Sequence, residues 1–190
     1  MTIAIIGAGA IGSVVAVYLA KAGEDIVLVG RKDQVEAIQK NGLRVVGARG
    51  EEIFPVQALA RLDREYDLVI FTVKTQDIEE ACAHNKAFLK KCLVLSSQNG
   101  VQSDTILAKH FDKARLYSSI VMFGATYTEP GQAVFNFEGD WIIGKPFAGN
   151  DENTPRIAQA LGKAFSAVVS DNITGMKWLK LLVNFNNCIP

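Results

Sequence analysis

The chain has 190 residues, of which 49% are hydrophobic and 21% charged, and its 20 basic residues balance its 20 acidic residues. This length allows one good hydrophobic core and the beginning of a second. The charge balance argues against a polyanion or a membrane surface as partner, so we expect no nucleic acid and no membrane among the partners. No apolar run is long enough to span a membrane, and no basic leader precedes the first apolar segment, so no signal peptide or anchor is predicted.

The three cysteines, Cys82, Cys92 and Cys188, are odd in number and lack metal-ligand spacing. We therefore expect no metal site. Free thiols are typical of a reducing compartment, so a cytoplasmic location is predicted.

The first 96 residues alternate strand and helix patterns. Thr2–Ile6 is a short apolar run, and a helical pattern then covers Ala10–Ala22 up to Gly23, before the next strand at Asp25–Val29. Such a βαβ unit requires parallel strands. The further predicted elements are a helix at Asp33–Lys40, strands at Leu43–Val46, Glu52–Val56 and Asp67–Val73, a helix at Asp77–Lys90 and a strand at Cys92–Ser96. The sequence thus predicts an α/β fold, a Rossmann-type doubly wound sheet.

The pattern changes after residue 100. Turn residues at Glu129-Pro130-Gly131 and Gly139-Asp140 separate strand patterns and predict added strands in a partly antiparallel portion of sheet. The elements predicted here are a short helix at Val101–His110, strands at Leu116–Met122, Ala133–Phe137 and Trp141–Ile143, a helix at Pro155–Ala167 and a strand at Val168–Val169. We expect residues 1–170 to form one Rossmann-type domain.

A last helical pattern runs from Thr174 to Cys188. Its apolar side has no predicted element to cover it and consists of Trp178, Leu181, Leu182 and Phe185. We expect residues 171–190 to be the first helix of a further domain that is truncated here, so that the chain lacks a further domain or is a fragment.

The segment Gly7-Ala8-Gly9-Ala10-Ile11-Gly12 lies between the first strand and the first helix, where a dinucleotide-binding loop belongs. Gly7 would allow the tight turn, Gly9 the approach of the backbone to phosphate, and Gly12 the packing of helix on strand. The free amides at the start of the helix would face the pyrophosphate. The alternative is a glycine turn that serves packing alone.

The end of the second strand carries Gly30-Arg31-Lys32, where NAD-preferring sites usually have an acidic residue. A guanidinium at Arg31 suits a 2′-phosphate, which favours NADPH over NADH. The alternative is a solvated basic pair at a strand end.

Lys74 and Asn99 each follow a buried strand, at the edge where open α/β sheets bind ligands. A solvated lysine and an ordinary turn are the alternatives for these two positions. Their shared edge favours a role in the binding cleft.

Several segments, taken together, resemble the ketopantoate reductases (2-dehydropantoate 2-reductases). They are the glycine loop, Arg31, Thr72-Val73-Lys74-Thr75-Gln76, Gln98-Asn99-Gly100, Glu129-Pro130-Gly131 and Trp178-Leu179-Lys180-Leu181-Leu182-Val183-Asn184. The resemblance extends over essentially the whole chain, and these segments in this order are specific in combination. It implies that NADPH delivers hydride to an α-keto acid and forms a 2-hydroxy acid, as in pantothenate biosynthesis.

By the same resemblance, Lys180 is the proton donor, Asn184 is a substrate ligand, and Lys74 and Asn99 line the cofactor and substrate cleft. The spacing of Lys180 and Asn184 independently puts both on one helix face, from which they can reach one small ligand. A lysine beside a bound carbonyl can polarise it and supply a proton. The alternative for Lys180 is a lysine that extends from a packed helix into water.

The sequence departs from the family at Cys188, where members commonly have an asparagine, and this leaves open a related reductase acting on another keto acid or an imine. The family's helical domain also supplies a serine and a glutamate, for which no match can follow Pro190. We therefore expect a chain that ends there to bind cofactor weakly and to turn over little. A noncatalytic dinucleotide-binding module is the other alternative, and any homo-oligomer is expected to form through the helical domain.

Overall fold

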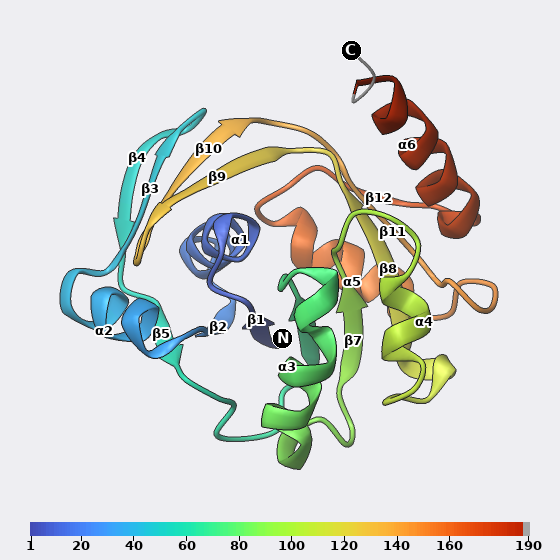
Figure 1. Ribbon diagram of the computed structural model, residues 1–190, viewed down its shortest axis with the longest axis horizontal. Helices are drawn as coiled ribbons and strands as arrows, with labels where there is room; N and C mark the ends of the chain where they lie inside the picture. Colours follow the sequence, from blue (N-terminus) through green and yellow to red (C-terminus); the bar gives the residue numbers. More distant parts are fainter. Residues whose placement is uncertain (188–190) are drawn as a thin grey trace.

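The computed structural model describes residues 1–187 and contains two β-sheets with helices packed around them (Figure 1). The larger sheet has eight strands in the order β12-β11-β8-β7-β6-β1-β2-β5. Its strands are β1 (Thr2–Ile6), β2 (Asp25–Val29), β5 (Gln57–Leu59), β6 (Leu68–Phe71), β7 (Leu93–Ser96), β8 (Leu116–Val121), β11 (Trp141–Gly144) and β12 (Ala167–Val169). All neighbours in this sheet pair in parallel except β8 and β11. The doubly wound sheet predicted from the sequence is confirmed.

The smaller sheet has the order β4-β3-β10-β9 and joins segments far apart in the chain. Its strands are β3 (Leu43–Gly47), β4 (Gly50–Phe54), β9 (Gly124–Glu129) and β10 (Gln132–Phe137). Two hairpins, β3–β4 and β9–β10, meet where β10 runs parallel to β3. Figure 1 shows this sheet arched over the first helix, α1 (Ala10–Lys21), which packs against β3, β9 and β10.

Five further helices complete the fold. They are α2 (Lys32–Asn41), α3 (Ile78–Asn85), α4 (Ser103–Leu107), α5 (Asn153–Gly162) and α6 (Ile173–Asn187), and 3-10 turns occupy Thr75–Asp77, Lys86–Phe88 and Lys113–Arg115. Two buried clusters hold the layers together. One combines α1 and α5 with side chains of both sheets, and the other combines α3 and α4 with the opposite face of the main sheet.

The added strands differ from the expected arrangement. The strands predicted after residue 110 divide between the sheets, since β8 and β11 extend the main sheet whereas β10 joins the smaller one. The hairpin predicted at residues 43–56 also belongs to the smaller sheet. The sequence did not predict β5, which has three residues, or β9, whose side chains are half-buried or exposed and show no clear apolar alternation.

Three predicted helices have other bounds. Helix α4 covers only Ser103–Leu107 of the predicted Val101–His110, and α5 ends at Gly162 rather than at Ala167, which begins β12. The predicted helix Asp77–Lys90 ends as α3 at Asn85, whose side-chain oxygen accepts a hydrogen bond from Leu62 N at 2.7 Å. The chain then continues as a 3-10 turn. Helix α5 begins at Asn153, before the predicted start at Pro155, because proline is tolerated in a first turn, where its missing N–H has no helical partner.

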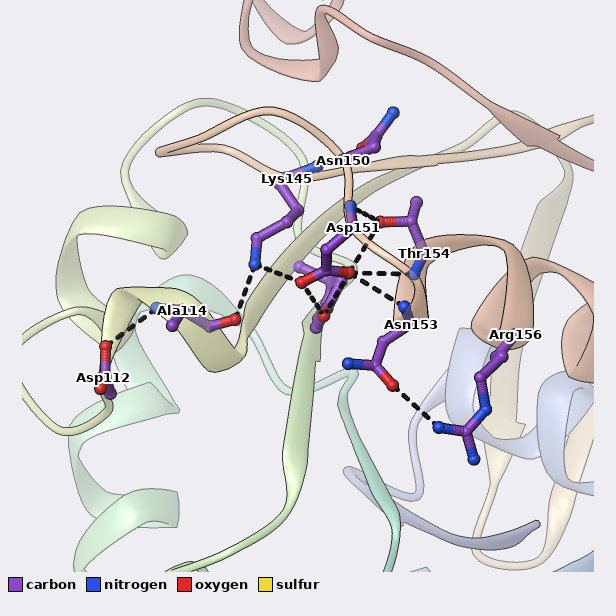
Figure 2. Close-up of polar contacts among 9 residues, drawn as sticks. Asp112, Ala114, Lys145, Asn150, Asp151, Asn153, Thr154 and Arg156 are labelled. Atoms are coloured by element: carbon purple, nitrogen blue, oxygen red, sulfur yellow. Dashed lines mark hydrogen bonds and ion pairs between the residues drawn. The ribbon is translucent and has the colours of Figure 1, made fainter.

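The N-terminus of α5 is fixed by Asp151 (Figure 2). The Asp151 carboxylate accepts hydrogen bonds from Asn153 N and Thr154 N at 3.0 and 3.2 Å and forms a salt bridge of 2.7 Å with Lys145. The Tyr117 hydroxyl on β8 donates to the same carboxylate at 2.9 Å. This cluster ties α5 to β8 and to the segment after β11.

Candidate functional site

The glycine loop joins β1 to α1, and two of its glycines are required by the packing of the protein itself. Gly7 has φ +123°, and a Cβ atom there would lie 2.6 Å from Val73 N. A Cβ at Gly12 would lie 1.9 Å from the Gly7 carbonyl oxygen. No heavy atom lies within 4 Å of the Cβ position of Gly9, which caps the N-terminus of α1. The open side of the loop therefore presents the free amides of a helix start to any ligand that enters.

A cleft of about 920 Å³ opens beside this loop. The segments that line it include Gly7–Ile11, Gly30–Lys32, Thr72–Lys74 and Tyr127. They come from the carboxyl ends of β1, β2 and β6 and from β9, so the cleft lies at the edge where open α/β sheets bind ligands. Its volume is at the upper end of the range for ligand sites.

Arg31 lies at the end of β2, on the rim of the cleft, and 70% of its side chain is exposed. Its contact with Asp33 is long, at 3.4 Å, and both side chains face solvent, so the pair contributes little to stability. The guanidinium is thus available to an anion in the cleft. Lys74 is also exposed and lines the same cleft beyond the end of β6.

Gln34 holds the two sides of the cleft together, and the sequence did not single it out. Its Nε2 donates to the Ala8 carbonyl at 2.8 Å and to the Tyr127 hydroxyl at 3.3 Å, while its Oε1 accepts from Arg31 N at 2.9 Å. One buried side chain therefore links the glycine loop, the start of α2 and β9. A glutamine three residues after a helix N-cap was the available signal.

The ends of β6 and β7 are linked in the same way by Gln98. Its Nε2 donates to the carbonyls of Phe71 and Val73 at 2.8 and 2.9 Å. The adjacent Asn99 lines a second, small cavity of about 10 Å³, sufficient for about one water molecule. The residues around it are Gln98, Asn99, Gly100, Ser119, Ile120, Lys177 and Lys180.

Lys180 extends from α6 to this cavity and meets Asn99 there. Its Nζ donates to Asn99 Oδ1 at 2.9 Å and to the Val121 carbonyl at 2.7 Å, and both acceptors are neutral. Burial lowers the pKa of Lys180 below its ordinary value of 10.5, and the positive charge of Lys177 lowers it further. The geometry suits a group that gives up a proton.

Asn184 lies one turn beyond Lys180 on α6 and is partly exposed. Among residues 1–185 its side chain has no hydrogen-bond partner. The apolar side chains of α6 that remain exposed are Trp178, Leu179, Leu182, Val183 and Phe185. Cys188, the position at which the sequence departs from the reductase pattern, lies outside the described residues.

Within residues 1–187 no cluster of histidine, cysteine and acidic side chains has the arrangement needed to hold a metal ion. None of the helices described is long and apolar enough to cross a membrane. Cys82 and Cys92 are free and buried, and burial raises the pKa of their thiols to about 12 and about 11.

Comparison with known proteins identifies the family. The sequence model described as "Ketopantoate reductase PanE/ApbA" matches residues 3–146, more than half of the chain. The chain belongs to this ketopantoate reductase family. The resemblance noted in its sequence motifs is thereby confirmed.

Two archaeal members of the family, both named 2-dehydropantoate 2-reductase, show how far the similarity extends. The protein of Pyrococcus horikoshii is 34% identical over 97% of this chain, and that of Archaeoglobus fulgidus is 33% identical over 95%. The chain spans 61% and 60% of these relatives, respectively.

Solved structures have the same fold. The 2-dehydropantoate 2-reductase of Geobacter metallireducens superimposes with a TM-score of 0.86 at 26% identity, covering 97% of this chain and 62% of that one. A D-mandelate dehydrogenase solved with NADH and anilino(oxo)acetate superimposes with a TM-score of 0.91 at 26% identity, covering 97% and 61%.

Proposed function

We propose that this chain is the nucleotide-binding part of a reductase that uses NADPH to convert an α-keto acid, 2-dehydropantoate, into the 2-hydroxy acid pantoate. The observation that supports this most directly is the position of Lys180. A partly buried ammonium group, held by neutral oxygens, lies at the ends of β7 and β8, on the same edge of the main sheet as the dinucleotide-sized cleft. Family membership and the names of the relatives support the same reaction.

The cleft suits a nicotinamide dinucleotide. The open side of Gly9 leaves room for a pyrophosphate at the start of α1, where backbone amides and the helix dipole favour negative charge. Gly7–Gly12 and Lys74 would hold this part of the ligand. The bound dinucleotide would supply the hydride.

The chain's own residues would supply the proton and the orientation. With a keto acid bound, hydride adds to the carbonyl carbon, and the oxygen takes a proton from Lys180 Nζ. Asn99 and the Val121 carbonyl hold that nitrogen in place before the reaction. Asn184, on the same side of α6, would bind the substrate.

The assigned role of Lys180 is tested by Lys180→Ala in the complete protein. Loss of the proton donor should lower kcat with 2-dehydropantoate by about 10²- to 10⁴-fold, while the Kd for NADPH stays within about twofold because Lys180 lies outside the cleft that holds the pyrophosphate. Turnover is followed by NADPH absorbance. A variant with unchanged kcat would refute the role of Lys180.

The preference for NADPH is proposed from Arg31, which would bind the 2′-phosphate. Arg31→Ala should weaken NADPH binding by about tenfold or more, equivalent to at least ~1.4 kcal/mol, and should leave NADH binding nearly unchanged. Lys40→Ala removes an exposed cation at the far end of α2 and serves as the control. Calorimetric titration of each variant gives both affinities, and an equal loss for the two coenzymes would contradict the proposal.

A second candidate is a reductase of the same type with another keto acid as substrate. The D-mandelate dehydrogenase structure, solved with an oxoacetate ligand, favours it. A screen of aliphatic and aromatic α-keto acids with both coenzymes distinguishes the two candidates, because the best kcat/KM identifies the substrate.

The remaining parts of the proposal concern organisation. Residues 1–170 form the NADP-binding domain, and residues 171–190 belong to the first helix of a helical substrate domain, which would cover the exposed apolar side chains of α6. Pairing of two copies would involve that helical domain. The two buried free thiols suit a reducing, cytoplasmic location.

A further inference from the structure

Lys177 is a buried lysine one turn before Lys180 on α6, and only 4% of the residue is exposed. Its Nζ donates to Asp104 Oδ2 and to Ser118 Oγ, both at 2.9 Å, and to Ser103 Oγ at 3.3 Å. These acceptors come from α4 and β8. The side chain therefore fastens α6 to two other elements with all three of its N–H groups in use.

Asp104 is also buried, with 8% of the residue exposed. Its carboxylate also accepts hydrogen bonds from the hydroxyls of Ser96 and Ser118, the latter at 2.8 and 2.9 Å to its two oxygens. A buried ion pair persists only when its remaining polar atoms are satisfied, and this one meets that condition. Since Asp104 and Lys177 pair at 2.9 Å, the carboxylate is directed to Lys177.

Lys180 has a different environment, although it shares a helix face and the small cavity with Lys177. Among the residues described, none of the ion pairs includes Lys180, and its partners are an amide oxygen and a carbonyl. The groups that face it are Asn99 from the segment after β7, the Val121 carbonyl of β8 and Lys177 of α6, and Lys177 in turn pairs with Asp104 of α4. Lys177 is thus the charged side chain that lines the small cavity together with Lys180.

We propose that Lys177 is a positioning residue for the reduction: paired with Asp104, it fixes α6 against β8 and holds a positive charge beside Lys180, which makes Lys180 a stronger proton donor. This inference rests on the proposed function for the catalytic role of Lys180. Lys177 itself is held by a carboxylate and two hydroxyls and does not reach the reacting atoms in this assignment.

Physical chemistry gives the direction of the effect. A neighbouring cation disfavours the charged form of an amine, as does burial, and both lower the pKa of Lys180. The salt bridge to Asp104 keeps the neighbouring cation in place without bringing a carboxylate to Lys180. Replacing the pair by neutral groups of similar shape should therefore weaken Lys180 as an acid while leaving the helix in place.

The test measures the titration of Lys180 in this chain by NMR of its side-chain ζ-amine and ε-carbon. In the double variant Lys177→Met/Asp104→Asn, the titration midpoint of Lys180 should move to higher pH. In Lys177→Met alone it should move further in the same direction, since the Asp104 carboxylate then remains without its partner. The matched control is Lys109→Met/Glu79→Gln, which removes an exposed ion pair and should leave the midpoint unchanged.

An unchanged Lys180 midpoint in the folded double variant would overturn the proposal. Equal shifts of the midpoint in the two Lys177 variants would also overturn it, because they would show that the Asp104 charge has no effect and that lost packing alone causes the shift. Protection of the α6 amides from exchange shows whether the helix stays docked. If the variants do not fold, the titration midpoint of Lys180 is compared with those of exposed lysines in the parent chain. Equal midpoints there would also overturn the proposal. The titration needs no turnover, so a failure of the reductase assay counts against the proposed function alone.

Discussion

The glycines of the loop after β1 have different physical roles. Gly7 and Gly12 are required by contacts within the protein, because an added methyl group would overlap backbone atoms. At Gly9 no part of the protein occupies the space. A ligand in the cleft would be what excludes a side chain there.

Gly9→Ala should therefore fold with an unchanged Tm and bind NADPH about tenfold more weakly or worse, a loss of at least ~1.4 kcal/mol. Thermal unfolding and calorimetric titration measure the two quantities. Gly149→Ala is the matched control, since its Cβ position is equally open but lies outside the cleft. Full affinity in Gly9→Ala would show that phosphate does not approach the loop at this residue.

At the same scale, the motifs in the sequence predicted part of the site. Lys180 and Asn99, predicted as proton donor and cleft residue, are hydrogen-bonded to each other. Lys177 was not predicted, because a lysine within an amphipathic helix normally extends into water, and its partner Asp104 lies 73 positions earlier. Contacts of this range depend on the packing of α6, which local spacing does not determine.

At the scale of elements, Glu24 joins three parts of the fold that are distant in sequence. Its side chain is 2% exposed and pairs with the N-terminal ammonium group at 3.0 Å and with Lys163, beyond α5, at 2.5 Å. Burial alone would raise the pKa of Glu24, but the two cations outweigh it and lower the pKa below 4.5. The carboxylate therefore contributes stability above pH 4.5, and this contribution is lost as the pH falls through the lower pKa of the folded state.

Glu24→Gln should reduce the free energy of unfolding at pH 7 by about 1–2 kcal/mol, because it replaces charged hydrogen bonds with weaker ones. The difference from the parent chain should persist down to about pH 5 and shrink at lower pH, where the parent carboxylate becomes protonated. Urea unfolding from pH 3 to 7 measures it. Glu36→Gln, which breaks an exposed pair with Lys32, should change little, and a loss as large as that of Glu24→Gln would contradict this reasoning.

The elements that sequence patterns predicted well are those with strong apolar periodicity. The buried strands β1, β2, β6 and β7 and the helix α1 lie where the pattern predicted them, within two residues. The strands β5 and β9 were missed because the first is very short and the second is mostly exposed, so neither has a continuous apolar signal. Tyr127, which lines the cleft, was missed together with β9.

At the scale of the whole molecule, the arrangement of strands could be predicted for the nucleotide-binding half but not for the smaller sheet. The short crossover between β1 and β2 requires that these two strands run parallel, as they do. The parallel pairing of β3 with β10 instead brings together Arg44 and Gln132, 88 positions apart. Neither strand carries a local signal for its partner, so the sequence did not place both hairpins in one sheet.

The smaller sheet also bears on the order in which the protein can form during synthesis. When β1, α1 and β2 have left the ribosome, the face of α1 that packs on β9 and β10 still lacks both strands. It stays uncovered until Phe137 has emerged. The nascent β1-α1-β2 unit therefore passes through a stage with an exposed apolar helix face, and folding chaperones have their greatest opportunity to act before the second hairpin closes over it.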